Sequence, residues 1–337
     1  MKISEIARKA GVSSMVVSRV MQGSPTVKRA DRERVEKAIS RLKLETAFIA
    51  APRKRKTRRI FGLIVPRFED IFHSFYATEV IKGVSLAASR LKLDIVFHVS
   101  DRQKHEDWLT SASLDPDYID GVLFADINGD MPQLKKVIAK NIPHILMNNY
   151  IEDKTINCIA VDNFKAAVNV AEYLINRGHV KIATIAGDLS TQAGKLRLDG
   201  FTTCMKKHNL NLPLKYVKVG HFLRSPARRE AEKLIGFADR PTAIFAASDV
   251  MAMEAIDVIR SKGLRVPEDI SVVGFDDNPL AAYSFIPLTT VWQPIAEMGR
   301  QAVELLNQII DNKIKQPVKV LLDTKLIKRA SCAKLEG

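Results

Sequence analysis

The chain has 337 residues and a formal net charge of +14. That length allows roughly two or three domains with a sizeable hydrophobic core. The charge is concentrated, because residues 1–59 carry a net charge of +12 and the rest of the chain only +2. A basic segment beside a nearly neutral body is typical of a nucleic-acid-binding module attached to another domain. Binding to a membrane surface is the alternative, but the sequence shows no strongly amphipathic basic helix with aromatic anchors.

Two further observations narrow the class of protein. No apolar run approaches the roughly 20 residues of a membrane span, and the start MKISEIARKAG has no apolar signal-peptide core. Cys158, Cys204 and Cys332 are far apart and lack the spacing of metal ligands. The sequence therefore predicts a cytoplasmic protein with reduced cysteines, no membrane partner and no metal site.

The first predicted elements are two short helices joined by a tight turn, in the segment ISEIARKAGVSSMVVSRVMQG of residues 3–23. Ser4 and Ser13 are the predicted N-caps, and Gly11 is expected to end the first helix. Apolar residues at helical spacing form the inner faces, namely Ile6, Ala7 and Ala10 in the first helix and Val17, Val20 and Met21 in the second. Four residues of the second helix then point outward: Ser14, Met15, Ser18 and Arg19.

This layout is that of a helix-turn-helix, whose second helix lies in the major groove of DNA with its early residues on base edges. An ordinary helical hairpin has the same spacing, so the N-terminal position and the positive charge are what favour DNA binding. A third helix is predicted over residues 31–42, with Val35, Ala38, Ile39 and Leu42 on its inner face. Six of the seven residues 53–59 are Lys or Arg, which indicates a flexible linker that also grips phosphates.

From residue 60 onward, short β-rich runs alternate with amphipathic helical stretches. The runs lie at residues 60–65, 93–99, 121–125, 144–147, 181–186, 243–248 and 270–275, and the helices include 163–177, 195–208, 249–262 and 294–311. Such alternation predicts parallel sheets covered by helices on both faces. Because the strands are too many for one small sheet and divide near Val161, we expect two similar open lobes with a cleft between them.

Ligands of open α/β sheets bind beyond the carboxyl ends of the strands, so the candidate ligand-binding residues are those that follow each run. They are Phe75, Tyr76, Asn148, Asn149, Arg197, Ser248, Asp249 and Asp276. Amides, carboxylates and aromatic rings suit a hydroxyl-rich or heterocyclic small molecule. Phe75 and Tyr76 fit equally well in a hydrophobic core, and Asp249 equally well as the N-cap of the helix that follows.

Motifs for catalysis and cofactor binding are absent from the sequence. It has no phosphate-binding loop, no G-x-G-x-x-G after a strand, no H-E-x-x-H and no G-x-S-x-G. We therefore expect no enzyme, no cofactor and no catalytic residues.

The chain resembles the lactose/galactose-repressor (LacI/GalR) family of bacterial transcription regulators. The resemblance rests on the N-terminal segment above, and on VDN at residues 161–163, LRLDGF at 196–201, SDVMAMEAI at 248–256, GLRVPEDISVVGFDD at 263–277 and LTTVWQPIAEMG at 288–299. It implies a small all-α helix-turn-helix headpiece, a hinge, and an α/β two-lobed core like the periplasmic binding proteins, with two open parallel sheets. It also implies a homodimer on a pseudo-palindromic operator of double-stranded DNA, and a small effector, a sugar or related metabolite, that changes DNA affinity.

The same resemblance assigns roles to single residues. Ser14, Met15 and Arg19 would face bases, Ser13 and Ser18 would face phosphates, and Ser4 and Thr26 would also contact DNA. The hinge departs from the family pattern N-P-x-A-x-x-L, whose leucine wedges into the minor groove. Arg53, a further predicted DNA contact, lies near the position of that leucine, and the candidate wedge is Phe48 or Ile49. The effector would contact Asn148, Arg197, Phe222, Ser248, Asp276 and Gln293.

The predicted domains are residues 1–44 for the headpiece, 45–59 for the hinge and basic linker, and 60–337 for the core. Within the core, the N-lobe is expected near residues 60–160 and 291–323, and the C-lobe near 161–290 and 324–337. The sequence thus predicts a DNA-binding repressor gated by a small molecule. The alternatives are a small-molecule receptor or an enzyme on the same α/β core, and a regulator whose cleft binds a protein or no ligand.

Overall fold

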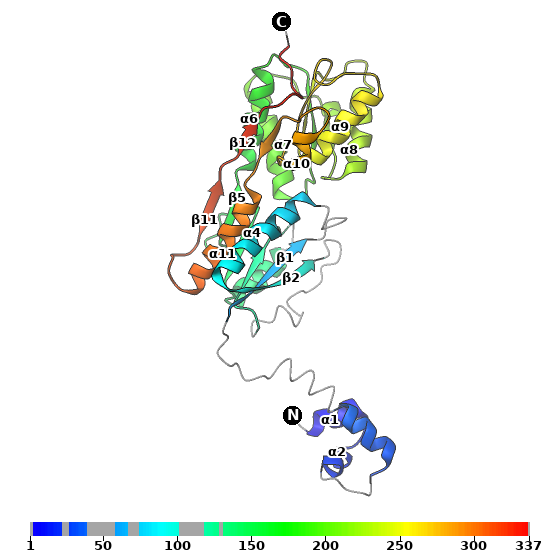
Figure 1. The fold of residues 1–337 in the computed structure, drawn as a ribbon, viewed down its shortest axis with the longest axis vertical. Coiled ribbons are helices and arrows are strands. Elements are labelled where there is room, and N and C mark those ends of the chain that lie inside the picture. The colour runs from blue at the N-terminus through cyan, green and yellow to red at the C-terminus, as the bar shows by residue number, and fades with distance from the viewer. Residues whose placement is uncertain are drawn as a thin grey trace. The chain divides into compact units, whose positions relative to one another are not determined.

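The computed structural model describes residues 3–21, 27–38, 58–66, 74–100, 118–127 and 131–335. The chain divides into two compact units, Met1–Arg58 and Arg59–Gly337. Figure 1 shows both units and labels many of their elements.

The N-terminal unit is a small helical domain. Helix α1 spans Ile3–Ala10, α2 spans Ser14–Met21, and a further helix covers residues 29–38. Gly11 takes a φ of +66°, and Ser13 Oγ accepts the Val16 N–H at 3.4 Å as the N-cap of α2. The buried core contains Ile6, Ala7, Ala10, Val17, Val20, Val35 and Ala38. The predicted turn, the second cap and these inner-face residues are therefore confirmed.

Two details of the helical unit differ from the prediction. Helix α1 begins at Ile3, so Ser4 lies inside the helix rather than at its N-cap. The third helix begins at residue 29 rather than 31, because the Lys28 carbonyl already accepts the N–H groups of Asp31 and Arg32, each at 3.0 Å. The side chains of Ser4 and Met21, and residues Ile39 and Leu42, lie outside the described part of the chain.

The first sheet of the core has the strand order β11-β5-β4-β3-β1-β2, with every pairing parallel. Its strands are β1 (Ile60–Pro66), β2 (Asp94–Ser100), β3 (Gly121–Phe124), β4 (His144–Met147), β5 (Cys158–Val161) and β11 (Lys319–Leu322). Alternate residues of β1 pack on opposite faces. Leu63 packs with α4 (Phe75–Leu91) and α11 (Ile295–Ile310), and Ile64 packs with α5 (Met131–Ala139). We call this sheet and its helices the N-lobe.

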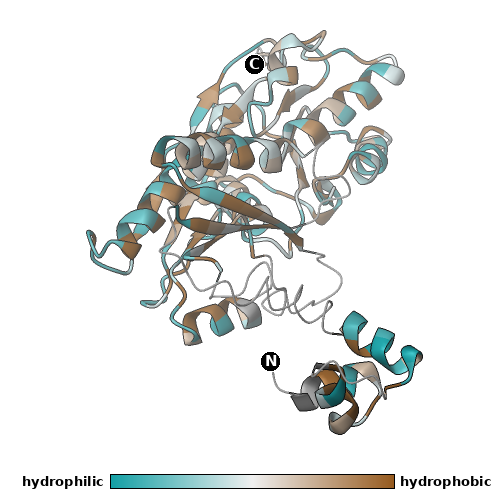
Figure 2. Cartoon of the chain, turned by 60° about the horizontal axis from the view of Figure 1, so that its bottom comes forward, coloured by the Kyte–Doolittle hydropathy of each residue, from teal (hydrophilic) through white to brown (hydrophobic). Residues whose placement is uncertain are grey.

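The second sheet has the parallel order β7-β6-β8-β9 and forms the C-lobe. Its strands are β6 (Ile182–Ala186), β7 (Val217–Val219, after the short helix Leu214–Tyr216), β8 (Ala243–Ala246) and β9 (Ser271–Val273). One face is covered by α6 (Asn163–Ile175) and α7 (Gln192–Lys207), the other by α8 (Arg224–Ile235) and α9 (Asp249–Ser261). Figure 2 shows hydrophobic residues along the strands of the core and hydrophilic residues on the outer sides of its helices.

The chain passes between the two lobes three times. It leaves the N-lobe after β5, returns after the C-lobe strand β10 (Thr290–Trp292), and leaves again between β11 and β12 (Lys325–Ile327). Strands β10 and β12 form an antiparallel pair that the sequence did not predict, beside the short helix α10 (Pro279–Tyr283) in the same lobe. The predicted fold class of a helical headpiece and two open parallel sheets is confirmed. Of the helices described, none combines the length and the apolar character that a membrane crossing requires.

Candidate functional site

The outer face of α2 carries the side chains that were predicted to contact DNA. Met15 is 64 % exposed, Ser14 and Arg19 are exposed as well, and Ser18 is half-buried. Within the described residues, no hydrogen bond or ion pair occupies the Arg19 guanidinium. The outer face of α2 therefore presents the N–H donors of the Arg19 guanidinium beside the hydroxyls of Ser14 and Ser18. Of the other predicted DNA contacts, Thr26, Phe48, Ile49 and Arg53 lie outside the described residues, as does the side chain of Ser4.

The core brings polar side chains together where its lobes meet. Gln192, at the start of α7 in the C-lobe, bonds twice to the backbone of Tyr150, which follows β4 in the N-lobe. The Tyr150 N–H donates to Gln192 Oε1 at 2.6 Å, and Gln192 Nε2 donates to the Tyr150 carbonyl at 2.8 Å. This pair ties the carboxyl end of one sheet to the first turn of α7. We call the surrounding set the lobe junction: Tyr76, Asn148, Tyr150, Gln192, Arg197, Asp276 and Gln293.

Arg197 is the charged centre of the lobe junction. Its side chain is 4 % exposed, and its Nε–H donates to Asn163 Oδ1 at 2.8 Å. One Nη donates to the Ala247 carbonyl at 2.7 Å, and the guanidinium carbon lies 3.6 Å from the centre of the Phe275 ring. Burial lowers the pKa of Arg197 to about 10, and the negative charge of Asp276 opposes that shift. The guanidinium therefore stays charged and can donate to a ligand at neutral pH.

Asp276 faces Arg197 at the carboxyl end of β9. Its Oδ1 accepts Gln293 Nε2 at 2.6 Å and lies 3.7 Å from an Arg197 nitrogen, which is longer than a direct hydrogen bond. Burial raises the pKa of Asp276 to about 6, although Arg197 and the Gln293 amide both favour the ionised form. The residue also takes a φ of 125°, a conformation that costs free energy and is concentrated at functional sites.

Ser248 and Asp249 are occupied by contacts within the chain. Ser248 Oγ accepts the Met251 N–H at 3.4 Å and is the N-cap of α9. Both Asp249 oxygens are bonded, one by the Thr290 hydroxyl at 2.5 Å and the other by the Asn278 N–H at 2.7 Å. Asp249 is fully buried, and burial together with the Asp276 charge raises its pKa well above the usual range. The pair thus holds the loops behind the lobe junction in place.

The N-lobe contributes amide and aromatic groups to the junction. Asn148 has a φ of 62° and lies directly after β4, with its Oδ1 buried and without a hydrogen-bond partner in the described part of the chain. Gln293 Oε1 is buried and unbonded in the same way. The Tyr76 hydroxyl donates to the Ala125 carbonyl, and both Phe75 and Tyr76 pack partly against the N-lobe core. Asn149 is used internally, because its Oδ1 accepts the Ile127 N–H at 3.2 Å.

Phe222 supplies a second aromatic ring near Arg197. Its ring centre lies 5.7 Å from the guanidinium carbon, and its backbone takes a φ of 62°. The ring fits there because residue 187 is glycine: a Cβ on Gly187 would lie 2.0 Å from Phe222 Cζ. Gly187 directly follows β6, so the missing side chain after that strand is what admits the aromatic ring.

Two contributors were absent from the sequence-based candidates. Gln192 bonds to a backbone 42 residues away, and Asn163 bonds to Arg197 across 34 residues. Asn163 stood in the VDN motif, which was the one available signal for it. Gln192 lies in a polar segment that gives no sign of its partner.

Comparisons with known proteins agree with the fold described above. The family described as "Bacterial regulatory proteins, lacI family" matches residues 2–45, and the "Periplasmic binding protein-like domain" matches residues 171–332. The HTH-type transcriptional repressor PurR of Vibrio vulnificus (strain CMCP6) is 32% identical over 315 residues, which cover 92% of each chain.

Two solved structures are similar over almost the whole chain. A complex of the transcriptional regulator CelR with cellobiose has a TM-score of 0.75 and 30% identity, and the match covers 98% of this chain and 99% of that one. The lac repressor dimer bound to operator and the anti-inducer ONPF has a TM-score of 0.73 and 26% identity, over 99% of each chain.

A helix-turn-helix unit joined to a two-lobed α/β core, with these relatives, defines the class: the protein is a DNA-binding transcriptional regulator and not an enzyme. The chain belongs to the LacI family of bacterial regulatory proteins. The resemblance seen in the sequence motifs is confirmed.

Proposed function

We propose that the protein is a cytoplasmic repressor that binds a pseudo-palindromic operator as a homodimer and is gated by a small effector at the lobe junction. The observation that carries the effector site is the pair of buried oxygens on Asn148 and Gln293 that have no donor among the described residues. A buried acceptor without a partner costs about 1–3 kcal/mol. A ligand that donates hydrogen bonds to both oxygens recovers that free energy.

The chemistry of the junction suits a sugar. Asn148, Gln293 and the Asp276 carboxylate accept hydrogen bonds, while Arg197 only donates. A sugar supplies hydroxyls that do both, and its C–H faces pack on rings such as Phe222. The CelR structure that this chain resembles holds cellobiose, which supports the same class. The proposed contacts are Phe75, Tyr76, Asn148, Arg197, Phe222, Asp276 and Gln293, with Ser248 and Asp249 holding the loops behind them.

Gating follows from the position of this site between the lobes. An effector that touches Asn148 in the N-lobe and Asp276 in the C-lobe favours one arrangement of the lobes over another. It changes operator affinity by as much as its own affinity differs between those arrangements. The two hydrogen bonds between Gln192 and Tyr150 join the lobes in the arrangement that this structure has.

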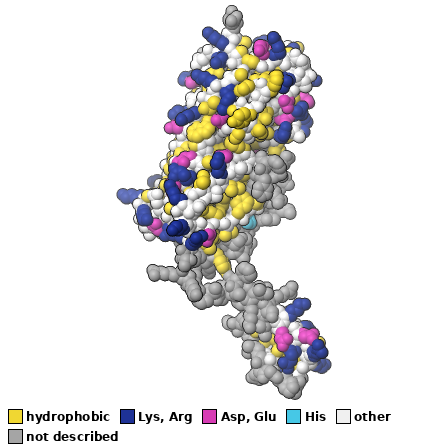
Figure 3. Space-filling model, viewed as in Figure 1, with side chains coloured by type: hydrophobic (Ala, Val, Ile, Leu, Met, Phe, Trp, Pro, Cys, Tyr) yellow, Lys and Arg dark blue, Asp and Glu magenta, His cyan; other side chains and the backbone are white. Residues whose placement is uncertain are grey.

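Exposed apolar side chains on the C-lobe support the proposed homodimer. Leu280, Tyr283 and Phe285 are 59, 87 and 84 % exposed around α10. Figure 3 shows hydrophobic side chains gathered on the upper half of the core, in the region where Figure 1 labels α10. Contiguous exposed apolar surface marks interaction sites, and the lac repressor structure with the same fold is a dimer.

Calorimetric titration with a panel of sugars, nucleosides and nucleobases tests the effector site. We expect one class to bind the wild type and the Asp257→Asn control, whose carboxylate is 56 % exposed on α9. Asp276→Asn should lose about 10- to 100-fold in affinity, since hydrogen bonds to charged groups contribute roughly 1.5–3 kcal/mol. Its operator affinity without effector should be unchanged. Equal affinity of the variant and the wild type would contradict the site, and no binding across the panel would favour a core that senses no metabolite.

A further inference from the structure

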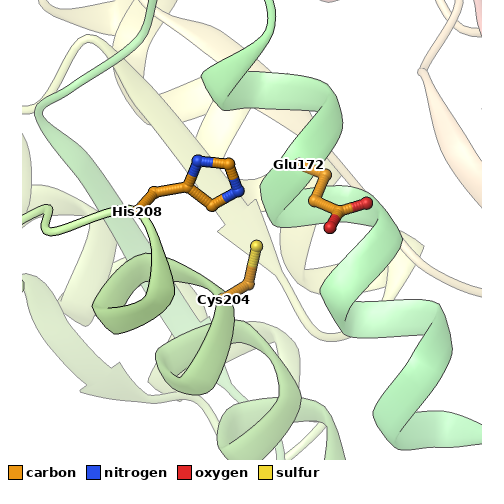
Figure 4. Close-up of side chains that lie close together, drawn as sticks. All are labelled: Glu172, Cys204 and His208. Atoms are coloured by element: carbon orange, nitrogen blue, oxygen red, sulfur yellow. The ribbon is translucent and has the colours of Figure 1, made fainter.

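We propose that Glu172, Cys204 and His208 form a binding site for a borderline transition-metal ion of the Zn²⁺ class on the C-lobe. Glu172 comes from α6, while Cys204 lies in α7 and His208 is the C-cap of that helix (Figure 4). One ligand atom of each side chain lies within 4.8 Å of the other two. A thiolate, an imidazole and a carboxylate are the ligand types that Zn²⁺ takes in proteins.

The helices hold these side chains in a suitable arrangement. Cys204 and His208 are four residues apart, so they lie on the same side of α7, one turn from each other. Helices α6 and α7 share one hydrophobic core, which fixes the third ligand opposite them. Ligands at about 2.0–2.3 Å from a tetrahedral ion lie roughly 3.3–3.8 Å apart, so the cluster must close by about 1 Å. Cys204 is buried, whereas His208 is exposed and Glu172 is 39 % exposed, so the outer two can rotate onto an ion.

The ligand atoms are available for an ion. Across the described ranges, no hydrogen bond occupies the Cys204 sulfur or the His208 ring. Lys207 Nζ lies 3.9 Å from Glu172 Oε1, too far for a hydrogen bond. A cysteine thiol is protonated at neutral pH, whereas a bound metal ion takes the thiolate. Binding therefore releases that proton to solvent as the sulfur–metal bond forms, and it leaves one of the four tetrahedral positions to water.

The site joins α7, which carries the junction residue Arg197, to α6, which begins at the hydrogen-bond partner of Arg197. Asn163 begins α6, and Arg197 lies two turns before Cys204 on α7. The Arg197 Nε–H donates to Asn163 Oδ1 at 2.8 Å. An ion between Glu172 and Cys204 would fix the opposite ends of the same helices. The sequence spacing suggested no metal site because its ligands come from two helices and meet only in the fold. None of the three proposed ligands is among the proposed effector contacts.

Titration of the chelator-treated full-length protein tests the site. With Zn²⁺ in a calorimeter we expect one ion per chain and the release of one proton, and with Co²⁺ a thiolate-to-cobalt charge-transfer absorption. Glu172→Gln and His208→Gln should each weaken binding at least tenfold, and Cys204→Ser should remove the absorption. Two matched controls should bind like the wild type: His221→Gln, which changes another exposed histidine, and Cys332→Ser, which changes another buried thiol.

Thermal unfolding supplies a second measurement that does not depend on the buried cysteine. A ligand that binds only the folded state raises the melting temperature. Zn²⁺ should therefore stabilise the wild type and His221→Gln but not His208→Gln. Because the His208 side chain is exposed, His208→Gln is expected to fold even if Cys204→Ser does not. Zn²⁺ affinity in all three ligand variants equal to that of the wild type, or stabilisation of His208→Gln equal to that of the wild type, would show an adventitious ion only and overturn the site.

Discussion

Arg197 and Asp276 show how a buried charge pair can remain receptive to a ligand. An isolated buried charge is costly, and here Asn163 and the Ala247 carbonyl satisfy part of the Arg197 guanidinium. Its separation of 3.7 Å from Asp276 is too long for a direct hydrogen bond. The two charges thus stabilise each other electrostatically while each keeps hydrogen-bonding capacity for a third group.

The raised pKa of Asp276 predicts that effector binding is linked to protons near pH 6. The folded pKa of about 6 lies above the ordinary 3.8, so the effector-free protein holds an extra proton between these values and loses stability as pH rises through that window. Donors on an effector favour the ionised carboxylate, so affinity should fall below pH 6 and binding should release protons. Calorimetry in two buffers of different ionisation enthalpy measures the release. A pH-independent affinity, or undiminished release in Asp276→Asn, would contradict the prediction.

Arg19 should supply sequence discrimination. Its exposed guanidinium can fork onto a guanine, and a bidentate pair of this kind contributes about 1–3 kcal/mol of discrimination. Arg19→Ala should therefore reduce the ratio of operator to non-operator affinity roughly 5- to 100-fold. Fluorescence anisotropy with both duplexes at fixed salt measures the ratio. Arg29→Ala, which removes the same charge from the helix over residues 29–38, should weaken both duplexes alike; an unchanged ratio in Arg19→Ala would refute the assignment.

At the scale of elements, helices α4 and α11 cross closely in the N-lobe because each has a glycine at the crossing. A Cβ on Gly83 would lie 1.9 Å from the Ala296 carbonyl oxygen, and one on Gly299 would lie 2.8 Å from the Val80 carbonyl oxygen. Each helix therefore has a glycine where the other's backbone passes. The contact fixes the first turn of α11, two residues beyond Gln293.

Gly83→Ala should force these helices apart. Overpacking of this kind costs about 1–3 kcal/mol, and here the obstacle is a backbone that cannot rotate away. Chemical denaturation should show that loss in the free energy of unfolding. Ser85→Ala on the exposed side of α4 is the control and should stay within about 0.5 kcal/mol of the wild type. A Gly83→Ala protein as stable as the wild type would mean that the helices can separate freely.

The sequence predicted those elements whose apolar residues repeat at a regular spacing or form an uninterrupted run. Helical spacing identified Ile6, Ala7 and Ala10 as core residues, and apolar runs identified β1 and β6. The strands β5, β7, β10, β11 and β12 escaped prediction. Each has only three or four residues, too few to show a period, and strands as short as β3 and β4 were recognised from their composition instead.

Prediction of the site was limited in a different way. Searching the ends of strands selected Asn148, Arg197 and Asp276, which the fold brings to the lobe junction. It did not select Gln192, because its partner is the Tyr150 backbone and the fold alone creates that pair. Nor could it separate Ser248 from Asp249, since which of them caps α9 depends on the residue at which β8 ends.

For the whole molecule, α11 connects the lobe junction to the start of the core. Gln293, which bonds to Asp276, lies two residues before the helix, and a helix of 16 residues is about 24 Å long. At its other end Arg59, the last residue of the predicted linker and the first of the core unit, pairs with Asp311 and donates to the Asn307 carbonyl at 3.4 Å. Arg59 and Lys313 lower the pKa of Asp311 to about 2, so this end stays ionised at neutral pH.

This geometry predicts that Asp311→Asn uncouples effector binding from operator binding. The variant keeps every proposed effector contact, so its effector affinity in a calorimeter should equal that of the wild type. Loss of this ion pair detaches Arg59, at the end of the linker, from the end of α11. The effector should then change operator affinity by a factor close to one, instead of the 5- to 150-fold that is typical of such coupling. Asp239→Asn breaks a comparable surface pair, with Lys181 at 2.5 Å in the C-lobe, and should couple normally. If Asp311→Asn couples as strongly as that control, the effector signal reaches the headpiece by a route other than the end of α11.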